Sequence, residues 1–198
     1  MKNIDQIKKL LIIVDMIKGF VNNGPMADIG ISHVIPEQLR LIELIKTEED
    51  GIAFIKDVHD RNCREFKRYP QHCVANTAEA ELVDELLPYE TEALVYPKNS
   101  TCALFNPHFL PDLKKMTALQ EIVIVGCCTD ICVMNLAIPL QNYLDEHNRD
   151  LLITIPMDAV ETYHAPGHDR AEYNEMAFKL LRQAGINLIE HYGSTLND

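Results

Sequence analysis

Hydrophobic residues recur along the chain in short, nearly unbroken runs that alternate with longer amphipathic segments. Runs rich in β-branched and aliphatic residues are typical of strands buried on both faces. Six such runs lie at residues 10–15, 52–57, 92–97, 121–126, 151–156 and 186–191. Segments in which apolar residues recur with helical spacing lie at 36–46, 77–87, 129–146 and 167–184.

Proline, asparagine and glutamate mark some of the expected helix ends. Pro36 suits the first turn of the helix at 36–46. Asn76 and Glu79, three positions later, resemble a capping pair for the helix at 77–87. Pro139 should kink or split the fourth pattern, at 129–146.

This alternation of strands and helices predicts one α/β domain over residues 1–198. We expect three layers, α/β/α, around a single, mostly parallel sheet of six strands, a Rossmann-like arrangement. Ligands of such sheets bind at the carboxyl ends of the strands. The residues that follow each strand are therefore the first place to look for chemistry.

Composition and charge narrow the function classes. The 198 residues include 18 basic and 30 acidic side chains, a net charge of −12, which argues against nucleic acid or an anionic membrane as the main partner. No apolar stretch approaches the roughly 18 residues of a membrane span. The apolar run near the start carries Asp15 and no small-residue cleavage site. We therefore expect a cytoplasmic protein whose cysteines are reduced.

Reactive residue types follow four of the expected strands. Asp15 ends the first, Asp57 and His59 follow the second, Lys98 follows the third, and the sequence GCCTDICV follows the fourth. Each has an ordinary explanation on its own, as a turn or cap residue, a solvated lysine or small apolar thiols. Their coincidence at one edge of a sheet favours a shared site.

The cysteine-rich stretch holds three of the six cysteines, at positions 127, 128 and 132. Neighbouring Cys127 and Cys128 would form a strained ring if bridged, and no CxxC pair suggests a zinc knuckle. Cys132 should lie in the first turn of a helix, where free N–H groups and the helix dipole lower a thiol pKa and can hold an oxyanion. Asp15 and Lys98 supply the proton acceptor and the charge partner of a nucleophile. No glycine-rich phosphate loop follows any strand.

The ordered segments IIVDM…GFV, DVH, YPQHC, PKNSTCALF, VGCCTDICV and PMDAV followed by HD resemble the isochorismatase-like cysteine hydrolases, and within them the nicotinamidases, also called pyrazinamidases. The resemblance implies a catalytic triad of Asp15, Lys98 and Cys132. It also implies a cis peptide bond between Cys127 and Cys128. The backbone N–H groups of Cys128 and Cys132 would then form an oxyanion hole.

The same resemblance implies one divalent metal ion, most simply zinc, with iron or manganese as alternatives. The ligands would be Asp57, His59 and His72, with Glu65 as a further carboxylate. Two imidazoles with a carboxylate suit such metals and leave positions open for water and ligand. The alternative is that the two histidines are ordinary loop residues.

Aromatic residues at positions that match the family pocket are Phe20, Tyr69 and Phe105, and they could stack on a flat heteroaromatic amide. Phe20 could equally be a core residue. The family usually begins Asp-x-Gln-x-Asp-Phe, whereas this chain reads DMIKGF, with Ile17 and Gly19 at the two polar positions. This departure removes polar support near Asp15.

Taken together, the resemblance implies deamidation of nicotinamide to nicotinate and ammonia through a cysteine thioester. One alternative is another amidase of the family that acts on a carbamoyl or ureido compound. Another is a non-catalytic binding protein that retains the fold. The expected partners are a small-molecule amide and further copies of the chain. His164 and His168, in the segment 156–169, we interpret as structural.

Overall fold

One parallel sheet forms the middle of the protein. The computed structural model describes residues 3–48 and 50–193, and within them seven strands form a sheet in the order β3-β2-β1-β4-β5-β7, with β6 paired to β4. Every pairing in it is parallel. The strands are β1 (Lys9–Val14), β2 (Gly51–Asp57), β3 (Leu94–Lys98), β4 (Glu121–Cys127), β5 (Leu152–Pro156), β6 (Val160–Glu161) and β7 (Asn187–Ile189). All six predicted strands are present, and the two-residue β6 is additional.

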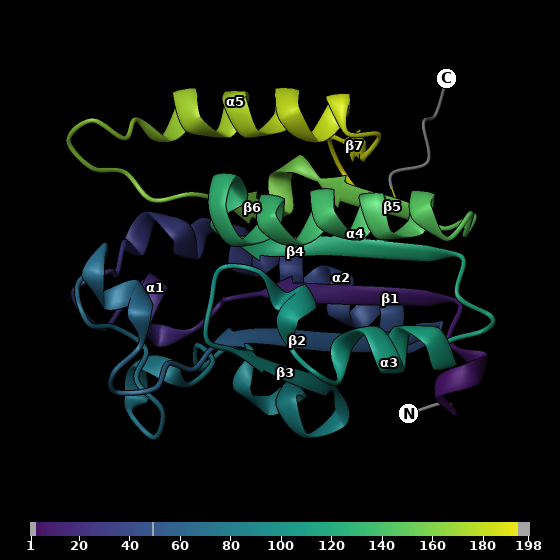
Figure 1. Cartoon of the computed structure of the whole chain (residues 1–198), viewed down its shortest axis with the longest axis horizontal. Coiled ribbons are helices and arrows are strands. Elements are labelled where there is room, and N and C mark those ends of the chain that lie inside the picture. The colour runs from purple at the N-terminus through teal and green to yellow at the C-terminus, as the bar shows by residue number, and fades with distance from the viewer. Residues whose placement is uncertain (1–2, 49, 194–198) are drawn as a thin grey trace.

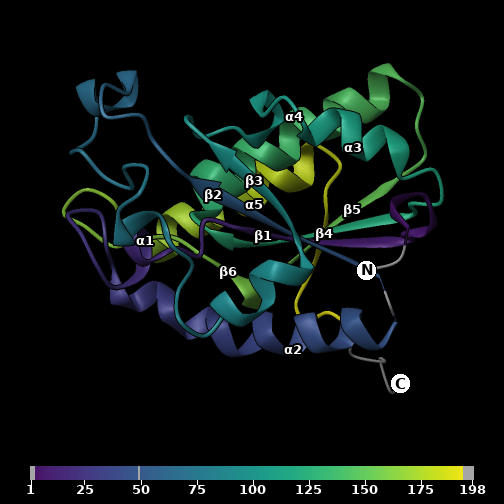
Figure 2. The same cartoon turned by 90° about the horizontal axis from the view of Figure 1, so that it is seen from below.

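Helices cover both faces of the sheet. They are α1 (Lys18–Val21), α2 (Ile35–Thr47), α3 (Phe109–Lys115), α4 (Met134–Glu146) and α5 (Arg170–Gln183). Figure 2 shows α2 on one side of the strands, with α3 and α4 on the other, and α5 packs beside α4. The predicted three-layer α/β/α architecture is confirmed. No helix in the described ranges is both long and apolar enough to cross a bilayer.

The central strand β1 shows why the sheet is buried on both faces. Its side chains alternate between the two faces, as the period of a strand requires. Leu10, Ile12 and Val14 join the core on the side of α4, whereas Leu11 and Ile13 join the core beneath α2. An unbroken apolar run is therefore what this strand needs.

The prediction of a helix at 77–87 is wrong. Only a short 3-10 turn at Ala78–Ala80 is present there, and Asn76 adopts a left-handed φ of +64° instead of capping a helix. The apolar residues Leu82, Val83 and Leu86 are nevertheless fully buried on the α2 side of the sheet. The helical spacing therefore identified residues that are indeed buried, although an irregular backbone and not a helix carries them.

The other helices differ from expectation in smaller ways. Pro36 lies in the first turn of α2, as predicted. The helix α4 is not split, because it continues through Pro139. The sequence pattern missed α3, a helix of seven residues with Pro111 in its first turn.

The carboxyl ends of the strands and the loops that follow them gather at one end of the molecule, on the left in Figure 1. At this end β1 and β4 approach closely where Val14 pairs with Gly126. Gly126 has a φ of +115°, and a Cβ atom there would overlap the backbone of Val14. Only glycine permits this contact, and the reactive residues follow directly after it.

Candidate active site

A carboxylate, an ammonium and a thiol meet at the end of the sheet. The Nζ atom of Lys98 lies 2.7 Å from Oδ2 of Asp15 and 3.5 Å from Sγ of Cys132. A carboxylate oxygen of Asp15 and the Cys132 sulfur are within 4.8 Å of each other. All three residues are buried. The three side chains predicted from distant parts of the sequence are therefore brought together.

The fold holds Asp15 from several directions. Asp15 follows β1 directly and has a left-handed φ of +51°, a conformation that is uncommon outside glycine but accessible to aspartate. Its Oδ1 accepts a hydrogen bond of 2.8 Å from the backbone N–H of Asp57 at the end of the neighbouring β2. Its backbone carbonyl lies 3.2 Å from Sγ of Cys127, which is buried.

Burial governs the proton affinities of this group. It raises the pKa of the Cys132 thiol well above its usual value, although Lys98 opposes the shift. The expectation that the helix start would lower this pKa is therefore wrong for so deeply buried a thiol. Burial also raises the pKa of Asp15 to about 7, again against the effect of Lys98. At neutral pH the protonated thiol thus lies beside a carboxyl group that can both accept and release a proton.

Lys98 is buried with two carboxylates. Burial alone would lower its pKa, but Asp15 and Asp57 outweigh this effect and raise it well above the usual value. Asp57 forms a direct ion pair with the same ammonium group. Lys98 is therefore a fixed positive charge and not a proton donor.

The thiol is carried by a widened helical turn. A π-helical turn spans Thr129–Val133 and leads into α4, and the N–H of Val133 donates to the carbonyl of Cys128, five residues earlier, at 3.1 Å. The peptide bond between Cys127 and Cys128 is cis, as predicted. The backbone N–H groups near Cys132 thus belong to the first turn of a long helix.

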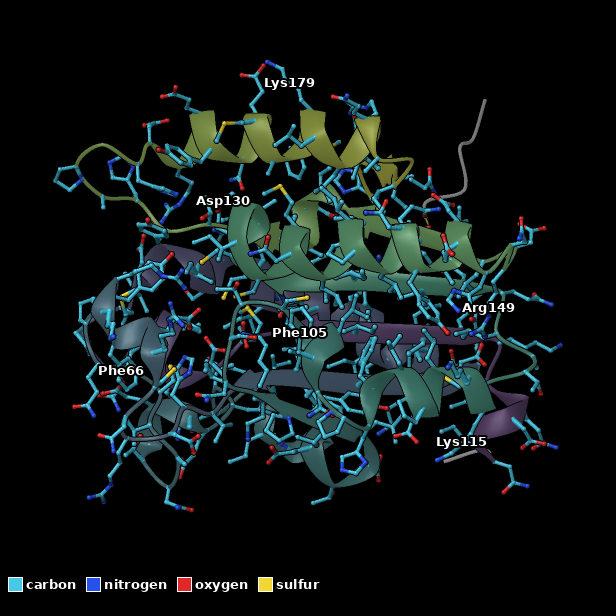
Figure 3. All side chains as sticks on the ribbon, viewed as in Figure 1. Phe66, Phe105, Lys115, Asp130, Arg149 and Lys179 are labelled. Atoms are coloured by element: carbon cyan, nitrogen blue, oxygen red, sulfur yellow. The ribbon has the colours of Figure 1, made fainter. Side chains whose placement is uncertain are left out.

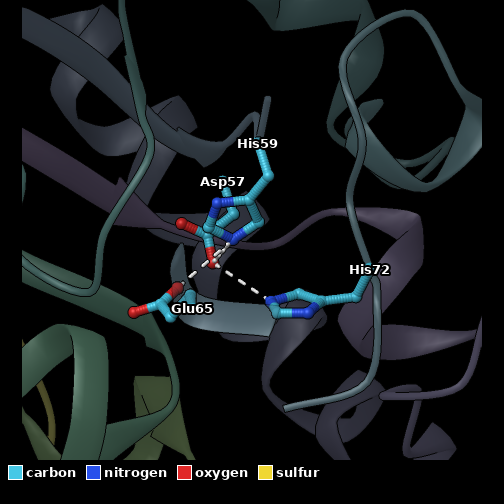
Figure 4. A group of neighbouring side chains, drawn as sticks. All are labelled: Asp57, His59, Glu65 and His72. Carbon is cyan, nitrogen blue, oxygen red and sulfur yellow. Dashed lines mark ion pairs between the residues drawn. The ribbon is translucent and has the colours of Figure 1, made fainter. Parts of the chain in front are cut away.

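Four buried side chains next to this group form a candidate metal site. Nε2 of His59 lies 3.4 Å from Oδ2 of Asp57 and 3.4 Å from Oε2 of Glu65, and Nε2 of His72 lies 4.0 Å from the same Asp57 oxygen. Figure 4 shows the four groups converging. These separations exceed ordinary hydrogen bonds, whereas donors about 2.1 Å from a common ion lie roughly 3–4 Å apart.

The ring orientations also fit a metal. Nδ1 of His72 lies 2.7 Å from the carbonyl of Pro70, an acceptor only, so Nδ1 carries the proton and Nε2 has a free lone pair. Nε2 of His59 is buried and has no hydrogen-bond partner of normal geometry within the described part of the chain. The donor set therefore suits a divalent ion, and it contains the four ligands predicted from the sequence.

One pocket joins the thiol to the metal group. Its walls include Cys132 together with Asp57, Glu65 and His72. The predicted pocket residues Phe20 and Tyr69 line it.

Phe105 lies elsewhere. Its side chain is 80% exposed (Figure 3), and it borders a separate depression near Pro97 and Asn106. The structure therefore does not bring Phe105 to the pocket.

The sequence reading missed four residues of the pocket wall. They are Met26, Thr101, Ile131 and Tyr163. Ile131 lies beside Cys132 in the π-helical turn, and Thr101 follows Lys98 by three residues, so both could have been sought next to the triad. Met26 and Tyr163 come from loops whose path carries no sequence signal.

Packing explains why the chain departs from the family pattern near Asp15. Ile17 is fully buried and forms an antiparallel bridge with Leu82. At Gly19, a Cβ atom would come within 2.9 Å of the Glu79 carbonyl and would also overlap Cys73. A polar side chain has no room at position 19. Asp57 and Lys98 supply the polar support for Asp15 instead.

His168 lies outside the pocket wall, but it contacts one residue of that wall, Tyr163. Its ring is stacked between Tyr163 and Tyr173, at 3.8 and 3.7 Å. Nε2 lies 3.0 Å from Oδ2 of Asp130, which belongs to the π-helical turn that leads into α4 (Figure 3). His164 is exposed and lies 3.8 Å from Asp169. These contacts agree with the structural roles expected for both histidines.

Comparison with protein families matches residues 9–191 to the isochorismatase domain. Nicotinamidase 1 of Arabidopsis thaliana is 32% identical over 140 residues, 63% of this chain and 57% of that protein. The isochorismatase family protein PncA of Bacillus subtilis, which is named uncharacterized, is 28% identical over 81% of this chain and 90% of its own length. A protein named "Probable inactive nicotinamidase", also of A. thaliana, is 24% identical over 62% of this chain and 67% of its own.

Solved structures show the same fold. The pyrazinamidase/nicotinamidase of Streptococcus mutans superposes with a TM-score of 0.78 at 21% identity, covering 92% of this chain and 100% of that one. The pyrazinamidase of Pyrococcus horikoshii, in complex with zinc, gives 0.71 at 23% identity over 92% and 99% of the two chains. The N-carbamoylsarcosine amidase of Thermoplasma acidophilum gives 0.72 at 20% identity over 97% and 100%.

Proposed function

The chain belongs to the isochorismatase family, and from this premise we propose that it is a metal-containing cysteine amidohydrolase that converts nicotinamide to nicotinate and ammonia. The observation that carries the proposal is the shared pocket, in which the Cys132 thiol and three residues of the metal group face one space. Phe20 and Tyr69 add flat aromatic surface to the walls.

The charge of the pocket supports a neutral substrate. Among the described residues, its wall carries the carboxylates Asp57 and Glu65 and no lysine or arginine. With a divalent cation held by these carboxylates, the wall would have no net charge. An uncharged heteroaromatic amide suits such a pocket better than an anionic carbamoyl acid, whose charge would find no partner.

In the first half of the reaction, Asp15 accepts the proton of the Cys132 thiol. The buried thiol needs this base because burial raises its pKa, and Lys98 stabilises the thiolate at 3.5 Å. The sulfur then attacks the carboxamide carbon, and the backbone N–H groups of Cys128 and Cys132 hold the oxyanion.

In the second half, Asp15 returns its proton to the leaving nitrogen. The C–N bond breaks, ammonia departs, and the acyl group remains on Cys132 as a thioester. Asp15, again a carboxylate, takes a proton from water as the water attacks the thioester. The C–S bond then breaks and Asp15 gives its proton to the departing sulfur, so that the carboxylic acid is released and the free thiol is restored.

Asp57, His59, Glu65 and His72 would hold the metal ion, which we propose to be zinc. When bound, the ion would supply a Lewis-acidic point for a heteroatom of the substrate ring or for a water molecule. Asp57 would connect this site to the nucleophile, since its Oδ1 pairs with Lys98 while its Oδ2 faces the histidines.

The decisive experiment measures ammonia release by the purified protein and by Cys132→Ala. We expect the variant to be folded but inactive, because it lacks the sulfur that forms the thioester. Cys102→Ala, a half-buried cysteine outside the pocket wall, serves as the matched control and should keep full activity. Ammonia release by Cys132→Ala at the wild-type rate would refute the mechanism.

The choice of substrate in the same assay separates the alternatives. Nicotinamide and pyrazinamide should be hydrolysed faster than N-carbamoyl amino acids, which are anionic. The opposite order would favour a carbamoyl amidase, the activity named for one of the structural neighbours. No turnover of any of these amides would favour a non-catalytic protein, as the name of one relative indicates for that relative. The expected homo-oligomer and cytoplasmic location stay predictions.

A further inference from the structure

The two imidazoles of the metal group are oriented by different partners. Nδ1 of His72 donates to a backbone carbonyl, which is present whatever the side chains are. Nδ1 of His59 instead lies 3.1 Å from Oδ1 of Asn99. The orientation of His59 therefore depends on a side chain that a single substitution can change.

Asn99 is itself held in one orientation. Its Nδ2 lies 3.3 Å from the carboxylate Oδ2 of Asp60, and its Oδ1 accepts the backbone N–H of Asp60 at 3.2 Å. Both contacts require the amide oxygen to be on the side of His59. Facing an acceptor, Nδ1 of His59 must carry the proton, so Nε2 presents its lone pair to the centre of the metal group.

A second group near His59 cannot replace this contact. Sγ of Cys63 lies 3.4 Å from Nδ1 of His59, but sulfur is a weak hydrogen-bond acceptor. The Cys63 thiol also donates to the backbone carbonyl of Asn99 at 3.6 Å, and this contact survives a change of the Asn99 side chain. Asn99 Oδ1 is therefore the strong acceptor that selects the proton position on His59.

We propose that Asn99 is a positioning residue for the metal site, which it serves by fixing the ring orientation and proton position of His59. This inference depends on the metal site of the proposed function. Asn99 follows Lys98, so the end of β3 supplies the ammonium for the thiol and the orienting amide for the metal group from consecutive residues. Loss of a hydrogen-bond partner behind a metal-ligating histidine weakens metal binding about 10- to 100-fold.

The test measures zinc affinity by competition with a chromophoric chelator, without substrate. We expect Asn99→Ala to bind zinc at least about tenfold more weakly than the wild type. Asn99→Asp, combined with Asp60→Asn so that two carboxylates do not face each other at this contact, retains an acceptor oxygen toward His59 and should bind zinc within about threefold of the wild type or more tightly. Asn99 is exposed at the surface, so neither substitution disturbs the core.

Two controls isolate the effect. Asn135→Ala removes another amide that contacts a residue near the site, with a hydrogen bond of 3.1 Å to Thr101, and should leave zinc affinity unchanged. In the metal-free variants, iodoacetamide should alkylate Cys132 at the wild-type rate, because the contacts of Asn99 are to His59 and Asp60 and not to the triad.

The outcomes distinguish the inference from the proposal on which it depends. If the wild type binds zinc and Asn99→Ala binds it equally well, the role of Asn99 is wrong while the metal site stands. If Asn99→Asp combined with Asp60→Asn binds zinc as weakly as Asn99→Ala, the inference is also overturned, since an acceptor oxygen would then not be what matters. A wild type that binds no divalent metal would overturn the metal site and this inference together.

Discussion

Gly126 is the residue that allows the two central strands to meet just before the reactive cluster. Its φ of +115° lies in a region that favours glycine. The space that a side chain would need is filled by the backbone of Val14, which cannot move aside without displacing β1. Asp15 and Cys127 follow these two residues directly, so the contact also sets the spacing between the carboxylate and the cysteine turn.

We therefore predict that Gly126→Ala lowers the free energy of unfolding by more than about 3 kcal/mol, as measured by urea denaturation. Gly167→Ala is the matched control, because Gly167 also has a positive φ, of +80°, but has open space around it. That substitution should cost only about 1–2 kcal/mol. If the two variants lose the same free energy of unfolding, the close approach of β1 and β4 is not what makes Gly126 necessary.

For single residues, the sequence predicted those site residues that lie at the carboxyl ends of strands. Asp15, Asp57 and Lys98 lie where parallel strands must bring them, and their side-chain types indicated their use. The raised pKa of Cys132 could not be predicted, since it reflects burial that only the packed structure defines. Phe105 was misplaced for a similar reason, because an aromatic residue after a strand can face either solvent or a pocket.

The loop between β6 and α5 is fastened to the turn that carries the thiol. Asp130 accepts a hydrogen bond of 2.5 Å from Thr162 through Oδ1 and contacts His168 through Oδ2. His168 in turn packs flat against Tyr163, a residue of the pocket wall. The position of this wall relative to Cys132 therefore depends on the ring of His168.

Replacing His168 by alanine should therefore weaken substrate binding. The variant loses two stacked contacts and the hydrogen bond to Asp130, about 2–3 kcal/mol of stability in total. With Tyr163 less well held, KM for the amide should rise several-fold more than kcat falls. Steady-state kinetics check this, with His164→Ala, an exposed histidine of the same loop, as the unchanged control. A fall in kcat without a rise in KM would contradict the prediction that His168 supports substrate binding by holding Tyr163 in place.

Elements were predicted correctly where the apolar pattern was dense, and wrongly where it was weak or also fitted a loop. The six strands have nearly unbroken apolar runs, and α2 has a clear helical period. The segment 77–87 has helical spacing, yet its leucines are buried by irregular backbone because Leu82 bridges Ile17. The helix α3 is short and contains Pro111, so its local signal resembles a loop.

Across the whole molecule, the candidate metal site combines a residue of the sheet with residues of a long irregular segment. Asp57 ends β2, whereas Glu65 and His72 come from the loops before β3. The regular structure of those loops is limited to short 3-10 turns and isolated bridges. An ion bound to side chains from both would stabilise the native state only, because the unfolded chain lacks the arranged donors.

Zinc at about 100 times its Kd should thus stabilise the protein by about 2.7 kcal/mol and raise Tm by roughly 5–10 °C. Thermal melts of the metal-stripped protein, with and without zinc, measure the shift, and a chelator should reverse it. His72→Ala should melt at the same temperature in both conditions. A shift of the same size in His72→Ala would place the ion elsewhere.

The layered architecture was the most predictable property, because alternating strand and helix patterns permit few arrangements of one sheet. How the loops at its edge close over a pocket was not predictable. Met26 and Tyr163 meet the thiol from segments more than 130 positions apart in the sequence, and their meeting depends on packing across the whole molecule.

The two oxygens of Asp57 serve different neighbours, one the Lys98 ammonium and the other the histidines. A protein designer could therefore not transplant the thiol centre to a new scaffold without carrying Asp57, and with it one ligand of the candidate cation site. A descendant that replaced Asp57 would likewise have to find another anion to balance the lysine.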